Sequence, residues 1–146
     1  MTVMTEHQIL LVQTSFARLV DDIDDVARIF FVRLFELDPT LEPMFSSEMQ
    51  VQGRKMFRTL LVIVNALNDL NTIVDMMRPL SKRHIGYGVK EEHYATVGKA
   101  LVLTIHEALG EASSLEIEAA WMDAYTLVAD IAKAAAYPKE TALSAD

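Results

Sequence analysis

The 146-residue sequence contains no cysteine and only five glycines and four prolines. Without cysteine the chain can form no disulfide, no thiolate nucleophile and no cysteine metal site. Glycine and proline are the residues that most often interrupt regular structure, so few interruptions are expected. The sequence therefore predicts long regular elements joined by short connections.

Positive charge and long apolar runs are also scarce. The chain has 13 basic and 21 acidic residues and a net charge of −8, which disfavours a nucleic acid or an anionic membrane as partner. The longest aliphatic run, residues 60–64, is far too short to cross a bilayer. Residues 1–7 lack the basic region and apolar stretch of a secretion signal. We therefore expect a soluble, cytoplasmic protein.

Apolar residues recur at helical spacing rather than in the alternation of half-buried strands. The length suits one domain with a substantial core. We therefore expect an all-α fold and a single domain over residues 1–146, with a frayed tail at about 138–146. Helices are predicted from a Thr5–Gln8 capping box, from the acidic run 21–25 to Asp38-Pro39, from Ser46-Ser47 to about Leu67, from Lys90 to Leu109 before Gly110, and from Ser113 or Ser114 to about Tyr137.

A further short helix is predicted at residues 78–89, where Pro79 can begin a helical turn and the following glycines can end it. His84 lies in its last turn and Leu80 one turn earlier, so the imidazole is expected on an apolar face. Such a histidine is either a packed core side chain or an iron ligand. The other three histidines show no spacing typical of a metal site.

One polar residue, Gln52, lies on a predicted apolar helix face. Gln52, Met56 and Leu60 follow one another at intervals of four, so they share that face. Phe45 stands at the corner that precedes this helix. Together with His84, these residues could flank a flat apolar ligand, with Gln52 on one side and the imidazole on the other.

Two segments carry a resemblance to a known family. The segment Pro79-Leu80-x-x-x-His84 is similar to the one in which globins carry the proximal haem ligand. The segment that follows this ligand in bacterial globins is similar to Gly88-Val89-Lys90-x-x-His93-Tyr94-x-x-Val97-Gly98. Over residues 6–137 the chain resembles globins, more narrowly the bacterial single-domain globins and the haem domains of flavohaemoglobins, with some likeness to neuroglobin.

The resemblance implies a globin fold, a three-over-three helical sandwich around a pocket for haem b. It implies His84 as the iron ligand and Gln52, at the distal position, as a hydrogen-bond donor to dioxygen held in the pocket. Phe45 matches the phenylalanine that wedges against haem. The remaining expected haem contacts are the apolar Phe31, Met56, Leu60, Leu80, Val89 and Val97, with Tyr94 on the proximal side and Lys55 and Arg83 near the propionates.

Two departures from the bacterial pattern qualify this expectation. Phe31 stands where many bacterial relatives have a second donor, a tyrosine, so very tight oxygen retention is not expected. In flavohaemoglobins the tyrosine that matches Tyr94 pairs with a glutamate on the last helix, but counting from Trp121 that position is Ala136. We therefore expect reversible binding of dioxygen, and of nitric oxide or carbon monoxide.

Two alternatives remain open. One is a nitric oxide dioxygenase, which would oxidise nitric oxide to nitrate with electrons from a separate reductase. The other is a globin-shaped interaction module that has lost haem, against which the joint presence of His84, Phe45 and Gln52 argues.

Overall fold

The computed structural model describes residues 4–45, 49–86 and 91–136. In this part of the chain the secondary structure is helical, with no strand. The helices are α1 Glu6–Ala17, η1 Val20–Asp22, α2 Ile23–Leu37, η2 Pro39–Met44, α3 Met49–Asn65, α4 Leu70–Gly86, α5 Glu91–Leu109, η3 Gly110–Ala112 and α6 Leu115–Ala136, where η marks a short 3₁₀ helix. None of these described helices is long and apolar enough to cross a membrane.

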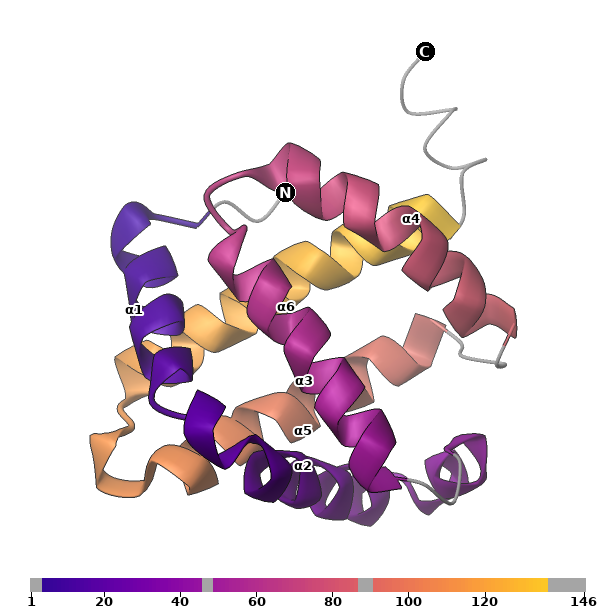
Figure 1. Cartoon of the computed structure of the whole chain (residues 1–146), viewed down its shortest axis with the longest axis horizontal. Coiled ribbons are helices and arrows are strands. Elements are labelled where there is room, and N and C mark those ends of the chain that lie inside the picture. Colours follow the sequence, from indigo (N-terminus) through magenta and orange to yellow (C-terminus); the bar gives the residue numbers. More distant parts are fainter. Residues whose placement is uncertain (1–3, 46–48, 87–90, 137–146) are drawn as a thin grey trace.

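The six α-helices of the described residues form two layers (Figure 1). One layer contains α1, α3 and α4, and the other contains α2, α5 and α6. Within the layers α1 packs on α3, and α5 packs on both α2 and α6; between them, α1 and α4 pack on α6 while α3 packs on α2. This confirms the all-α class and the predicted three-over-three arrangement.

Several helix boundaries follow from signals that were visible in the sequence. The Thr5 hydroxyl accepts a hydrogen bond from the Gln8 backbone at 3.1 Å, and the Gln8 side chain accepts one from the Thr5 backbone at 3.0 Å. The Ser114 hydroxyl caps α6 by accepting from the Ile117 backbone at 3.1 Å. Gly110 follows α5 with a φ of +56°, a conformation that glycine adopts without strain. These predicted boundaries are confirmed.

The prediction of a short helix at residues 78–89 is wrong at its start, because Pro79 lies inside α4. Pro79 cannot donate the helical hydrogen bond to the carbonyl of Asp75, and an interior proline costs roughly 3 kcal/mol. The helix persists because Ile73 and Met77, only 0% and 6% exposed, anchor the turns before the proline. Packing of α4 along α6 therefore overrides the local preference.

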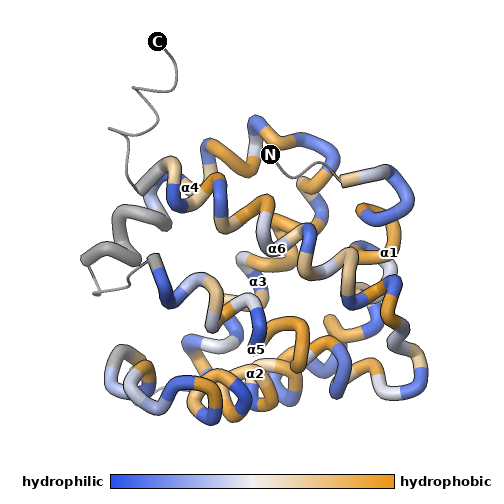
Figure 2. Tube along the Cα trace, turned by 180° about the vertical axis from the view of Figure 1, so that it is seen from behind, coloured by the Kyte–Doolittle hydropathy of each residue, from blue (hydrophilic) through white to orange (hydrophobic). Residues whose placement is uncertain are grey.

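The hydrophobic core lies between the two layers, and Figure 2 shows how hydrophobic and hydrophilic positions alternate along the helices. One buried polar contact crosses this core, in which the Trp121 indole N–H donates to the Ser15 hydroxyl at 2.9 Å. It joins α1 to α6. The largest fully buried side chains are Trp121, Phe16, Phe57, Leu34, Ile73, Ile105, Val12 and Thr104.

Candidate functional site

The corner between α2 and α3 places Phe45. Asp38, at the end of α2, accepts hydrogen bonds from the Thr40 backbone at 3.0 Å and from the Thr40 hydroxyl at 2.5 Å. The Thr40 hydroxyl bond, helped by the Thr40 backbone bond, holds the pKa of the Asp38 carboxyl below its ordinary value. The Phe45 backbone then donates to the Glu42 carbonyl at 3.1 Å. Short-range bonds thus fix the corner that carries Phe45.

Phe31 and Phe45, two of the predicted lining residues, are in contact. Their ring centroids lie 5.2 Å apart with the ring planes at 71°, an edge-to-face arrangement that aromatic rings favour. Phe35 contacts both rings, at centroid distances of 5.9 and 5.6 Å. Phe31 is buried, whereas Phe35 and Phe45 are half-buried, so the three rings form an apolar wall with two partly accessible members.

Gly53 brings α3 close to α2. A Cβ atom at Gly53 would lie 2.8 Å from the Ala27 Cβ and 3.2 Å from the Phe31 ring. Real side chains essentially never approach so closely, so only glycine allows this helix crossing. The role of Gly53 was not predicted from the sequence, although an isolated glycine in a helical pattern indicates a close approach of this kind. The crossing fixes α3, and with it the adjacent Gln52.

The predicted face of α3 is present and is only partly covered. Gln52, Met56 and Leu60 lie on successive turns and all three are half-buried. Lys55 lies on the same helix and is exposed. An exposed position suits the predicted pairing of this lysine with a haem propionate at the rim of the pocket.

Tyr94 and Val97 lie on the first turns of α5, and both are half-buried. The Tyr125 hydroxyl of α6 donates to the Tyr94 carbonyl at 2.6 Å. The Tyr125 ring fits over Gly98, where a Cβ would lie 2.6 Å from it. Burial raises the pKa of Tyr125 well above its ordinary value, so the phenol stays protonated and keeps donating.

A contact not predicted from the sequence involves Lys133 of α6. Its ammonium nitrogen lies 5.7 Å from the centroid of the Tyr94 ring, within the range of a cation–π interaction. The glutamate that pairs with the matching tyrosine in flavohaemoglobins was not expected here, and the structure places a basic side chain over the Tyr94 ring. No local pattern could have shown this, because the contact depends on how α5 and α6 pack.

The structure does not describe the side chains of four predicted haem contacts. His84, Leu80 and Arg83 belong to the last turns of α4, but their side chains lie outside the described part of the structure. Val89 lies outside the described residues altogether.

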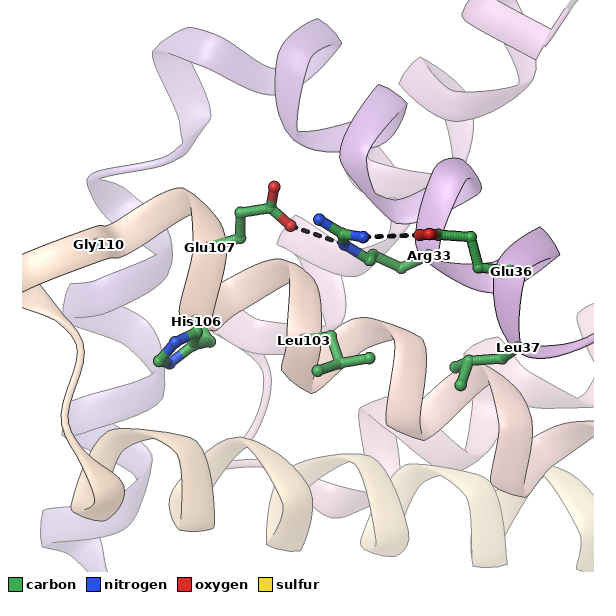
Figure 3. Close-up of a pocket in the computed structure, with 7 residues that line it drawn as sticks. All are labelled: Arg33, Glu36, Leu37, Leu103, His106, Glu107 and Gly110. Atoms are coloured by element: carbon green, nitrogen blue, oxygen red, sulfur yellow. Dashed lines mark hydrogen bonds and ion pairs between the residues drawn. The ribbon is translucent and has the colours of Figure 1, made fainter.

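A surface hollow of about 570 Å³ lies between α2 and α5, away from all predicted site residues (Figure 3). Arg33 crosses it, donating to Glu107 at 2.8 Å and to Glu36 at 2.6 Å, so its charge is already paired. Among the described side chains no three His, Asp or Glu residues are placed to hold a metal ion. The hollow is lined by Arg33, Glu36, Leu37, Leu103, His106, Glu107 and Gly110.

The described lining residues fit a flat apolar group. Phe45, Met56, Leu60 and Val97 come from three different elements, and each remains partly exposed although it is apolar. Covering such surface gains about 25 cal/mol per Å². Gln52 contributes an uncharged amide to the α3 face, so an apolar plate would meet no charge at Gln52, Met56 or Leu60.

Comparison with known proteins places this chain in a family. Residues 28–132 match the family model described as Globin. The chain is 36% identical to a flavohemoprotein of Bacillus subtilis over 106 residues, which cover 69% of this chain and 26% of that protein. It is 31% identical to a flavohemoprotein of Bordetella pertussis over 125 residues, which cover 83% of this chain and 31% of that protein. It thus spans less than a third of the length of these two relatives.

Solved structures show the same fold. A bacterial globin from Campylobacter jejuni superposes with a TM-score of 0.82 at 24% identity, over 94% of this chain and 99% of that one. The myoglobin of Aplysia limacina superposes with a TM-score of 0.79 at 21% identity, over 91% and 99%. The chain belongs to the globin family, as a haem-binding globin, and the predicted globin fold is confirmed.

Proposed function

We propose that this globin binds dioxygen reversibly, and nitric oxide and carbon monoxide at the same place, with His84 as the iron ligand of haem b. The observation that carries the proposal is the half-buried Gln52 on the partly covered face of α3, next to Gly53, where α3 crosses α2 against the Phe31 ring. Haem, when bound, supplies a ferrous iron with an open position for a diatomic gas.

The Gln52 amide can donate a hydrogen bond to the gas. In a pocket with little water such a bond is worth about 1 to 3 kcal/mol. Phe31 cannot provide a second donor, so we expect intermediate rather than very tight retention of oxygen. Because α3 is held against α2 at Gly53, the donor is carried by a fixed helix and needs little reorganisation.

The helix that carries His84 is supported separately. α4 packs along α6, whereas α3 packs on α2 and α1. The two proposed sides of the site are therefore each held by a helix of the opposite layer. Lys55 and Arg83 are the proposed partners of the haem propionates. The remaining proposed contacts are Met56, Leu60, Leu80, Val89, Tyr94 and Val97.

Spectra of the purified protein with added haem test the proposal first. A Soret band should form with one haem per chain, and His84→Ala should lose haem faster. Without a Soret band in the wild-type protein the proposal is rejected.

Oxygen release then tests Gln52. Gln52→Leu should release oxygen roughly 5- to 150-fold faster, which corresponds to the loss of about 1 to 3 kcal/mol. Gln50→Leu, at an exposed position of the same helix, is the matched control and should leave the rate unchanged. An unchanged rate in Gln52→Leu removes this residue from gas binding.

A second candidate function is nitric oxide dioxygenation. It is favoured by the relatives' name, flavohemoprotein, which describes proteins with flavin as well as haem. The activity would need electrons from a separate reductase. Sustained production of nitrate from nitric oxide, with a flavin reductase and a nicotinamide cofactor added, would support it. A single stoichiometric conversion would support gas binding alone.

A further inference from the structure

Lys133 has an unusual position for a lysine, because it is half-buried and lies over an aromatic ring. Its ammonium nitrogen is 5.7 Å from the centroid of the half-buried Tyr94 ring. In the described part of the chain it forms no ion pair with a carboxylate. A cation held in this way is less hydrated and less screened than a surface lysine, so its field reaches further into the protein.

Tyr94 is also held from a second point on α6. The Tyr125 hydroxyl donates to the Tyr94 carbonyl at 2.6 Å, and the ring of Tyr125 rests on Gly98. Tyr125 and Lys133 are eight residues apart (133 − 125), which places them on one face of α6 two turns from each other. The ring that supports the cation is therefore fixed by the same helix that supplies it.

This arrangement lies at the end of the molecule where the His84 helix terminates. His84 belongs to the last turn of α4, Tyr94 to the first turn of α5, and α4 packs along α6. Figure 1 shows the C-terminal end of α6 running beside α4. Lys133 lies three residues (136 − 133) before the end of α6, the helix along which α4 packs, and its charge lies over Tyr94, one of the proposed haem contacts on the proximal side.

We propose that Lys133 is a positioning residue that, stacked on Tyr94, keeps a positive charge on the proximal side of the haem and favours ferrous over ferric iron. The inference rests on the proposed role of His84 as iron ligand. Its physical basis is that ferric iron carries one more positive charge than ferrous iron, so a nearby cation raises the energy of the oxidised state more.

The test is the reduction potential of the haem-loaded protein, measured by spectroelectrochemistry in wild type and variants. Lys133→Gln should shift the equilibrium toward ferric iron about threefold, which is about 28 mV at 59 mV per tenfold change for one electron. Lys133→Glu should shift it about tenfold, about 59 mV. Lys133→Arg, which keeps a cation over the ring, should stay at the wild-type potential.

Lys99→Gln is the matched control, since it removes the same charge from an exposed position of α5. It should leave the potential unchanged. Equal shifts in Lys133→Gln and Lys99→Gln, or no shift in Lys133→Gln, would overturn the inference. A loss of stability without a change in potential would also overturn it, because it would make Lys133 merely structural.

Failure of this inference is distinguishable from failure of the proposed function. If the wild-type protein forms no Soret band, the proposed function fails. If haem binds but the reduction potentials of wild type and Lys133→Gln are equal, only the proposed role of Lys133 fails. The stack itself is checked without haem, because the Tyr94 ring should move the NMR signal of the Lys133 ε-methylene protons upfield. An unshifted signal would show that the contact does not form in solution and would overturn the inference.

Discussion

Replacing Gly53 by alanine tests the close crossing of α2 and α3. The added Cβ would lie 2.8 Å from the Ala27 Cβ and 3.2 Å from the Phe31 ring, whereas carbon atoms in contact prefer about 3.5 to 4.0 Å. The two helices must therefore separate by several tenths of an ångström. Overpacking of this kind costs about 1 to 3 kcal/mol, and the better helix propensity of alanine returns about 1 kcal/mol.

We therefore expect Gly53→Ala to lower the free energy of unfolding by about 1 kcal/mol, or the melting temperature by roughly 4 °C. Urea unfolding followed by circular dichroism measures the free energy of unfolding. The double variant Ala27→Gly/Gly53→Ala moves the methyl group from one helix to the other and should regain most of the loss. Such a rescue would appear as a favourable coupling of about 1 to 2 kcal/mol in a double-mutant cycle.

The propensity contribution has its own control on the same helix. Arg58 is exposed on α3, so the difference between Arg58→Ala and Arg58→Gly reports the alanine-to-glycine preference without any packing change. If Gly53→Ala is as stabilising as that difference, or if the double variant is merely additive, the crossing is not tight and the reasoning is wrong.

Three further predictions concern bonds elsewhere in the fold. Ser15→Ala should cost about 1 to 3 kcal/mol in urea unfolding, because it leaves the buried Trp121 indole N–H without its acceptor. The pKa of Asp38 is lowered in the folded state, so its contribution to stability is present above the ordinary aspartate pKa and is lost as the pH falls below it. The stability difference between wild type and Asp38→Asn should shrink accordingly in acid. Tyr125→Phe should cost about 1 kcal/mol, measured in urea, because the donor to the Tyr94 carbonyl is lost.

Each of these predictions has a discriminating comparison. Thr14→Ala removes a hydroxyl that bonds the preceding turn at an exposed position, so it should cost much less than Ser15→Ala. Asp21→Asn makes the same change as Asp38→Asn at another exposed site, and identical acid profiles for the two would contradict the role of Asp38. A Tyr125→Phe protein as stable as wild type would show that its hydroxyl bond contributes nothing.

Local signals in the sequence predicted the helix ends well. The Thr5–Gln8 capping box, the Ser114 cap and the stop at Asp38 depend only on residues within a few positions of one another. The same is true of Gly110, whose positive φ ends α5. Such features are determined by short-range hydrogen bonds and allowed backbone angles, so they can be read without knowing which helices pack together.

Features that depend on helix packing could not be predicted from the sequence. Pro79 was expected to begin a helix, but it lies inside α4 because Ile73 and Met77 anchor the preceding turns. The importance of Gly53 appears only when α2 lies against α3. Likewise Lys133 meets Tyr94 only through the packing of α5 with α6.

Helical periodicity predicted one part of the candidate site, and the resemblance to globins predicted the rest. Periodicity was enough to place Gln52, Met56 and Leu60 on one face of α3, and the structure agrees. The resemblance to globins predicted Phe31 and Phe45 as lining residues, but the contact between their rings, which joins two elements, was not predicted. The haem contacts of these residues stay predictions that the experiments above test.

The junction of α1 and α6 also provides the protein with a single optical reporter. Trp121 is the only tryptophan of the chain, is 1% exposed and is bonded to Ser15. Its emission should therefore be blue-shifted in the folded protein and move to longer wavelength when α1 separates from α6. Because one emitter sits in each chain, its quenching by energy transfer to added haem would count the haem bound per folded molecule, independently of the Soret band.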